Sequence, residues 1–303
     1  MVDYKSILKD KEQRLKILNA LKFIPDSLMI RLQFRLVMKE KLNLKNPKTF
    51  NEKLNWLKLY DHNSKHIQMV DKYRVRKYVQ KIVGKEYLIP LIGKWDSYND
   101  IDFNKLPEKF VMKCNHDSGS VRIISNKDKI NHREMSDFFK DRLKNNPYTY
   151  GREWPYKYVK PCIVVEKYMC DSEGQAPVDY KFFCFNGYVD SVMICTGRGT
   201  TEKKFYFFSK EWKLRKYNRS TQNLPDDFTI DKPDGIDKLF DLAAKLSVGE
   251  AFVRVDFYLI DGQPYFGEFT YYPASGLDCN LVSWADQYLG DLINLEIIKG
   301  RKK

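Results

Sequence analysis

Two apolar segments near the C-terminus carry acidic side chains at a spacing that suits metal binding. Residues 251–270 read as a two-stranded hairpin, and side chains two apart on a strand share one face. Asp256 lies opposite Glu268 if the turn contains three residues, 261–263, whereas a two-residue turn would put the acids on opposite faces. Opposed carboxylates repel each other unless a cation lies between them. We therefore expect either Mg²⁺, completed by water and phosphate oxygens, or an ion pair with Arg254.

Two earlier segments have the residue types that bind a nucleotide. Residues 110–114 read as a strand that contains Lys113 and leads into a loop of small residues, 118–120. A lysine and the backbone amides of such a loop can hold phosphates, although the sequence has no Gly-x-x-x-x-Gly-Lys run and hence no P-loop. Residues 162–169 read as a buried strand that becomes a polar crossing, where backbone groups can meet adenine, and Asp179 can accept from ribose hydroxyls. This order favours a triphosphate held between two lobes.

The N-terminal region that precedes these segments reads as helical from residue 3 to residue 60. Residues 28–42 are densely apolar, with Arg31 and Arg35 four positions apart. Two interpretations remain open for this helix: a core helix with an arginine edge, or an interfacial helix on an anionic membrane. The next helix has a clear start signal, because Thr49–Glu52 has the spacing of a capping box.

The remaining chain alternates helices and strands. Apolar periodicity predicts helices at residues 73–83, 135–143 and 235–246. Residues 178–215 read as an antiparallel set in which Asn186-Gly187 forms a hairpin turn.

Charge and composition narrow the classes of protein. The 303 residues have a net charge of +13, and residues 1–80 hold 19 basic against 8 acidic side chains, so the excess lies in the first quarter. No run of eighteen apolar residues or signal peptide is apparent, and the six cysteines include no Cys-x-x-Cys pair, as in a reducing cytoplasm. No nucleic-acid motif is present, and we expect no nucleic-acid partner. A cytoplasmic protein is expected, with a peripheral position on the inner membrane face as the alternative to a free one.

Together these segments resemble the ATP-grasp superfamily, and within it the TupA-like branch of capsule and teichuronopeptide synthesis, over residues 45–290. The matching pieces are Lys48-Thr49-Phe50-Asn51-Glu52-Lys53, Asp71-Lys72, Pro90-Leu91-Ile92-Gly93, Lys113 with Asn115-His116, Asp179-Tyr180-Lys181, and the set of Arg254, Asp256 and Glu268. The resemblance implies an α+β ATP-grasp fold, in which two α+β lobes hold ATP between them, preceded by a basic helical N-terminal segment. The implied domains are residues 1–66, 67–165 and 166–303.

The resemblance also implies a role for each matching position. For ATP, the implied ligands are Lys72 and Lys113 at the α- and β-phosphates, the loop of Ser118, Gly119 and Ser120 over them, Glu166 with the backbone of Lys167, Tyr168 and Met169 at adenine, Asp179 at the ribose, and Lys181 at the γ-phosphate. For Mg²⁺, they are Asp256, Glu268 and Thr270, the last standing where many members have asparagine. The implied catalytic residues are Arg254, Arg198 and Lys181, and the implied substrate contacts are Ser275, Gly276 and His116.

The activity implied is an ATP- and Mg²⁺-dependent ligase that joins an amine to a carboxylate through an acyl phosphate. Its expected partners are an amine donor and a glycan or sugar-carboxylate acceptor in cell-surface polysaccharide synthesis, and residues 1–45 provide a possible contact with an anionic membrane. Two other hypotheses stay open. One is a glycosyltransferase of capsular polysaccharide synthesis that uses a nucleotide sugar, and the other is a non-catalytic adaptor for a polyanion or a membrane.

Overall fold

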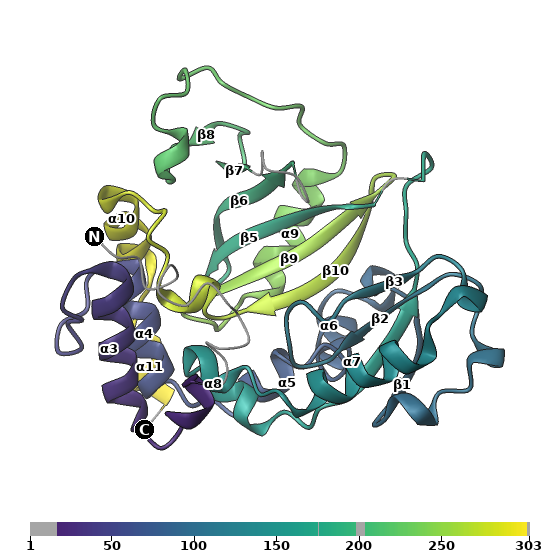
Figure 1. Cartoon of the computed structure of the whole chain (residues 1–303). Coiled ribbons are helices and arrows are strands. Elements are labelled where there is room, and N and C mark those ends of the chain that lie inside the picture. The colour runs from purple at the N-terminus through teal and green to yellow at the C-terminus, as the bar shows by residue number, and fades with distance from the viewer. Residues whose placement is uncertain (1–16, 175, 198–203, 302–303) are drawn as a thin grey trace.

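The computed structural model describes residues 17–174, 176–197 and 204–301, and its strands form two antiparallel sheets (Figure 1). The smaller sheet has the order β1-β4-β2-β3, with β1 at Leu91–Trp95, β2 at Phe110–Cys114, β3 at Arg122–Ile124 and β4 at Ile163–Lys167. The larger sheet has the order β10-β9-β5-β6-β7-β8, with β5 at Val178–Phe185, β6 at Tyr188–Thr196, β7 at Lys204–Phe208, β8 at Leu214–Arg215, β9 at Val253–Ile260 and β10 at Gln263–Thr270. The expected α+β class is confirmed.

The helices cover the sheets and form a separate group beside the larger one (Figure 1). They are α3 (Asp26–Met38), α4 (Phe50–Tyr60), α5 (Lys65–Met69), α6 (Val75–Ile82), α7 (His132–Lys144), α8 (Tyr148–Gly151), α9 (Ile236–Leu246), α10 (Ser283–Leu292) and α11 (Glu296–Arg301). The three helices expected after residue 71 are thus confirmed as α6, α7 and α9. In the part of the chain that the structure describes, no helix is both long and apolar enough to cross a membrane.

The smaller sheet buries one face and leaves the other for polar side chains. Phe110, Met112 and Cys114 alternate into a core that also contains Phe139 of α7. Lys113 lies between them in sequence and therefore points to the opposite face. The alternation places a lysine on the face opposite this core, where its side chain is largely buried and lies next to Glu166 of β4.

The N-terminal helices pack onto the rest of the molecule. Ile30 and Phe34 of α3 are buried in a small cluster to which Trp56 of α4 also belongs, and α4 contacts α10. The expected capping box is confirmed, because the Thr49 side chain accepts from the Glu52 backbone while the Glu52 side chain accepts from the Thr49 backbone. The expected helix over the first residues lies mostly outside the described part, which begins at residue 17.

The register of the β9–β10 hairpin differs from the expected one, although its outcome is the same. The turn is the two-residue Asp261-Gly262 pair, both at positive φ, and not the three-residue turn on which the pairing of Asp256 with Glu268 was made to depend. Such a turn alone would put the two acids on opposite faces. A bulge between Phe266 and Glu268 adds one residue, and Glu268 then pairs with Asp256. The expected pairing is therefore confirmed through a bulge that the sequence analysis did not foresee.

The other expected hairpin follows the sequence directly. Asn186 and Gly187 have positive φ and join β5 to β6, with Phe185 paired to Tyr188. Asn-Gly readily adopts positive φ at both central residues of a turn, which explains why this hairpin could be predicted from the sequence.

We predict that Thr49→Ala lowers the free energy of unfolding by about 1 kcal/mol, because the α4 N-terminus loses its side-chain acceptor. Thr49→Ser is the matched control, since it keeps the hydroxyl and should stay close to the parent protein. Urea unfolding followed by circular dichroism measures both variants. Equal losses for alanine and serine would show that the methyl group, and not the cap, stabilises this region.

Candidate functional site

Three carboxylates and two cations gather on one face of the larger sheet. Asp256 of β9 lies between Lys181 of β5 and Glu268 of β10 in the strand pairing. Lys181 forms ion pairs with Asp179 and, at 3.0 Å, with Asp256. Arg254 donates two hydrogen bonds to the Asp256 carboxylate, at 2.7 and 2.6 Å. The two interpretations of the acidic pair, a Mg²⁺ site and an ion pair with Arg254, thus concern the same carboxylate, because Arg254 contacts Asp256.

A third cation reaches these acids from outside the larger sheet. Lys72 precedes α6, and its ammonium lies 3.1 Å from the Glu268 carboxylate and donates to the Asp117 carbonyl at 2.8 Å. Burial alone would raise the pKa of Glu268, but Lys72 and Arg254 outweigh it and lower this pKa to about 2. Glu268 is therefore ionised at neutral pH. Lys72 connects the loop of the smaller sheet with β10.

The pKa of Asp179 moves in the opposite direction. Burial raises it, and the nearby Asp256 carboxylate raises it further, against the ion pair with Lys181. Asp179 therefore lies in a less favourable setting for a carboxylate than Glu268, with Lys181 as the cation that it shares with Asp256.

Glu166 on the smaller sheet binds two cations. One oxygen lies 2.5 Å from the Lys113 ammonium and the other lies 3.3 Å from the Arg76 guanidinium. In this arrangement, the residue expected at adenine instead pairs with the lysine expected at phosphate. The crossing begins at Lys167, whose backbone donates to the Pro90 carbonyl at 2.9 Å, and continues through half-buried Tyr168 and Met169.

The loop after β2 is held largely by its own side chains. The Ser120 hydroxyl is buried, accepts from the Cys114 backbone at 2.8 Å and donates to Asp117. Gly119 has a φ of 92°, and the exposed Ser118 accepts from Arg142 through its carbonyl at 2.7 Å. The exposed Ser118-Gly119 tip is thus accessible to phosphate, whereas the hydroxyl of Ser120 is used inside the loop.

His116 lies inside the protein beneath this loop. Its two ring nitrogens lie 3.3 Å from the Asn115 side-chain oxygen and 2.8 Å from the Asn145 carbonyl. Burial lowers the pKa of His116. These contacts suit a residue that holds the loop, and its expected contact with substrate stays a prediction.

The loop that follows β10 is held in place from α4. Ala274 and Ser275 both have left-handed φ, at 48° and 53°, within the 3-10 turn Pro273–Gly276. Asn55 donates to the Gly276 carbonyl at 2.7 Å, and Lys58 donates to the Ser275 carbonyl at 2.6 Å. Such backbone angles persist only where the surroundings impose them, and α4 supplies the contacts that do so here.

A partly buried acid completes the support of this loop. Glu153 accepts from the Ser275 hydroxyl at 2.6 Å, and burial raises the pKa of Glu153. Burial lowers the pKa of Lys58 to about 8, although the Glu153 charge opposes the shift. Ser275 is thus bound at both its hydroxyl and its carbonyl, which fixes the loop that follows β10.

Asn55, Lys58 and Glu153 were not among the residues expected at the site. Tyr258, which strand alternation places on the same face as Asp256, pairs with Asp179 across the sheet, and its ring lies over Gly267, where a side chain would come within 3.4 Å of it. Nothing local to Glu153 indicates its role.

The expected Arg198 lies outside the described residues, and Thr270 accepts from Arg254 at 3.0 Å. The remaining donor set suits the implied ligands. Two carboxylates on paired strands match the number that Mg²⁺ takes from protein when phosphates supply further oxygens. Lys72 and Lys181 contact these two acids, and Lys113 pairs with Glu166 on the smaller sheet, so three separate cations are present for the charge of a triphosphate.

The comparisons with known proteins include one family match and several similar solved structures. Residues 52–294 match the family described as TupA-like ATPgrasp, and no curated protein matches. The D-alanine–D-alanine ligase from Bacillus anthracis complexed with ATP is 16% identical, with 86% of this chain and 72% of that chain covered at a TM-score of 0.46. The L-amino acid ligase from Bacillus licheniformis is 12% identical, with 89% and 57% covered at a TM-score of 0.44.

The family match spans most of the chain, including both sheets and every described residue of the acidic cluster. It confirms the expected ATP-grasp fold and, at the level of the family, the expected ATP-dependent ligase class with ATP and Mg²⁺ as cofactors. The individual residue roles stay predictions. The chain belongs to the TupA-like ATP-grasp family.

Proposed function

We propose that this protein is a carboxylate–amine ligase whose reaction takes place between the acids of β9–β10 and the two lysines Lys72 and Lys113. The observation that carries the proposal is the Asp256–Glu268 pair, which lies across two strands with Lys72 and Lys181 at its ends. This arrangement combines a place for a divalent cation with separate positive charges for phosphates.

In this reaction, a carboxylate oxygen of the substrate bonds to the γ-phosphorus of ATP while the bond from that phosphorus to the bridging oxygen of ADP breaks. The resulting acyl phosphate is attacked at its carbonyl carbon by an amine, which loses a proton as inorganic phosphate leaves. Mg²⁺, when bound by Asp256 and Glu268, supplies charge neutralisation at the phosphates. Lys181 and Arg254 act on the transferring group, because positioning and charge account for most of the catalysis of phosphoryl transfer.

The loop that contains Ser275 and Gly276 follows β10, which ends at Thr270. We assign it to the acceptor side of the site, because α4 fixes its backbone after the strand that contains Glu268. We assign the nucleotide to Lys72, Lys113, the Ser118–Ser120 loop, the 166–169 crossing and Asp179. In this assignment Glu166 has one of two roles. It either leaves Lys113 and Arg76 and contacts adenine, or it stays paired with Lys113 and orients that lysine toward a phosphate.

The carboxylate is proposed to belong to a uronic or amino acid of a cell-surface glycan such as a capsular polysaccharide. Support comes from the resemblance to the capsule branch of the superfamily and from the excess of basic residues in the first 80 positions. An enzyme of this kind acts in the cytoplasm on a precursor, and its acceptor is expected to carry negative charge.

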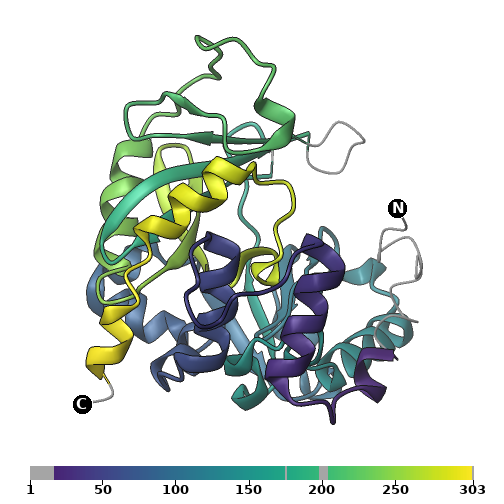
Figure 2. The same ribbon diagram turned by 90° about the vertical axis from the view of Figure 1, so that its left-hand side faces the viewer.

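A peripheral position on an anionic membrane is proposed from the outer face of α3. Leu28, Leu32 and Leu36 recur every four residues and are 59%, 47% and 40% exposed. Arg31 and Arg35 are exposed on the same side of the helix. Figure 2 shows α3, in purple, along the outside of the molecule. A row of leucines beside arginines is the pattern of a helix that lies in the interface of an anionic bilayer.

We predict that Glu268→Gln weakens Mg²⁺-dependent ATP binding roughly tenfold or more, since one of two metal-binding charges is lost. Glu268 is the better choice because its side chain is 37% exposed against 3% for Asp256, so the variant is more certain to fold. Asp261→Asn in the hairpin turn is the matched control and should bind as the parent does. Calorimetry with ATP, with and without Mg²⁺, measures the effect.

The same preparation distinguishes the ligase from the other activities. Thermal stabilisation by Mg²⁺ and ATP, with ADP and phosphate as products in the presence of both substrates, is the expected result. Stabilisation by a UDP-sugar and not by ATP would indicate the glycosyltransferase. Release of AMP and pyrophosphate, or no nucleotide binding, would contradict the proposed reaction.

We predict that replacing Leu28, Leu32 and Leu36 with serine lowers binding to phosphatidylglycerol vesicles more than tenfold, because each inserted leucine contributes on the order of 1 kcal/mol. Val248→Ser removes an equally exposed apolar side chain elsewhere and is the control. Substitution is preferable to deletion of residues 1–45, which would uncover buried Trp56 contacts of α3. Sedimentation that is unchanged in the triple variant, or absent in the parent, would rule out this surface.

A further inference from the structure

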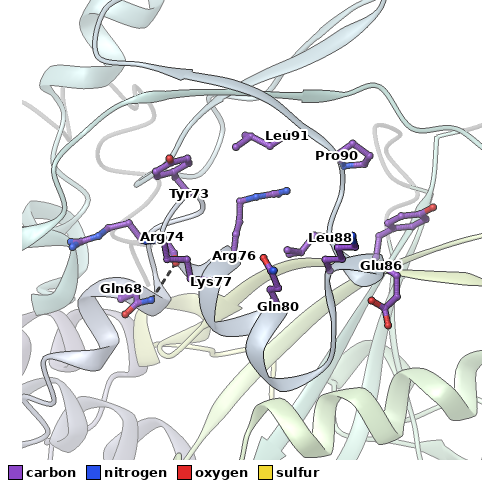
Figure 3. A pocket seen from close by; sticks show the side chains of 12 residues that line it. Gln68, Tyr73, Arg74, Arg76, Lys77, Gln80, Glu86, Leu88, Pro90 and Leu91 are labelled. Carbon is purple, nitrogen blue, oxygen red and sulfur yellow. Dashed lines mark hydrogen bonds between the residues drawn. The ribbon is translucent and has the colours of Figure 1, made fainter.

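A cavity of about 850 Å³ lies beside α6, outside the cluster of acids. Its walls come from the end of α5 and the start of α6, from residues 85–91, and from Tyr265 of β10 (Figure 3). None of the residues assigned above to nucleotide, Mg²⁺ or the acceptor loop lines it. The cavity is therefore a site that the proposed reaction does not yet use.

The walls of the cavity carry an excess of positive charge. Arg74, Arg76, Lys77 and Lys85 line it, together with a single acid, Glu86. Within the described residues, Arg74, Lys77 and Lys85 form no ion pair, and all three are exposed. Such cations are costly to bring together unless an anion compensates them, so the cavity is suited to a ligand with more than one negative charge.

Arg76 differs from the other cations because it is fixed. Its guanidinium donates to the Ile89 carbonyl at 2.7 Å and contacts Glu166 at 3.3 Å. In Figure 3 its side chain extends from α6 toward the space between Tyr73 and Pro90. A cation held in this way offers its remaining N–H groups in one direction, which favours a bound carboxylate over a diffuse ion atmosphere.

The rest of the lining can contact sugar rings. Tyr73 is 38% exposed, and Tyr265 contributes a second ring from the edge of β10. Gln68 and Gln80 add amide groups that both donate and accept. Aromatic rings pack on the apolar faces of sugars while amides bond to hydroxyls, and an acidic peptide or a free phosphate would leave these groups without a partner.

We propose that this cavity binds an acidic saccharide, with its carboxylates on the basic side chains and its rings against Tyr73 and Tyr265. The inference rests on the proposed function, because the saccharide is the non-reacting part of the carboxylate substrate. Tyr265 and Glu268 belong to the same strand, so a ligand anchored in the cavity lies along the edge that leads to the acids. Binding remote from the reacting group can then position the carboxylate.

The test uses the full chain and trigalacturonate as the probe, with binding measured by calorimetry at low ionic strength. The double variant Arg74→Gln/Lys77→Gln should bind roughly tenfold more weakly or worse, since two unpaired cations are removed. Lys81→Gln removes an exposed charge from the same helix but outside the cavity, and should bind as the parent does. Arg76 is left intact because it also holds Glu166.

Two further probes test the chemical class. Maltotriose, which is neutral, should bind roughly tenfold more weakly than trigalacturonate, and Tyr73→Ala should weaken trigalacturonate without changing the weak binding of pentaglutamate. No binding of trigalacturonate, equal binding by the double variant, or pentaglutamate binding as tight as the saccharide would each overturn the inference. Binding of ATP is measured in parallel. If trigalacturonate binds and ATP does not, the proposed reaction fails while the cavity assignment stands, and the reverse result overturns the cavity alone.

Discussion

The repulsion among Asp179, Asp256 and Glu268 is the constraint on which the site depends. Three carboxylates on neighbouring strands are stable only if cations reach them, and each cation comes from a different part of the chain. Lys181 comes from the same sheet, whereas Lys72 reaches Glu268 from the segment before α6 while also binding the loop of the smaller sheet. Neutralising the acids therefore also holds the two lobes together at the site. In the proposed function, the arrival of a metal frees these same cations to contact phosphate.

The register of β9 and β10 shows how a sequence can indicate the right pairing for the wrong reason. The Asp261-Gly262 turn has the two-residue form that an Asp-Gly pair favours, so the local signal was available. The bulge before Glu268 was not, because it depends on how β10 fits β9 and on the absence of a side chain at Gly267. Local patterns predicted the capping box and the Asn186-Gly187 turn, whereas the alignment of the acids is a property of the pair of strands.

The N-terminal segment shows the same limit over a longer distance. Its excess charge suggested a docking surface apart from the catalyst, yet Asn55 and Lys58 of α4 hold the strained loop after β10. The sequence does contain a signal, because Asn51, Asn55 and Lys58 follow one another at helical spacing beside the apolar stripe of α4. Polar side chains next to an apolar stripe usually face solvent, so this signal alone does not indicate buried partners. What the sequence could not supply was their partner, more than two hundred residues away. Contacts at that range follow from the fold alone.

The positive charge of the first 80 residues thus has two physical meanings that only burial separates. Lys58, Lys72 and Arg76 are largely buried and bond to carbonyls or carboxylates of the protein itself, so they contribute little to long-range attraction of a partner, whereas Lys72 and Arg76 remain placed to contact a ligand once it is bound. Arg31, Arg35, Arg74 and Lys77 remain exposed, on the outer face of α3 and at the cavity beside α6. Because exposed cations act on anions in solution while buried ones act on their own neighbours, net charge overstates the attraction. The exposed positive charge lies in two places, on α3 beside a row of leucines and at the cavity beside two aromatic rings. The leucines suit a membrane surface, whereas the aromatic rings suit a saccharide.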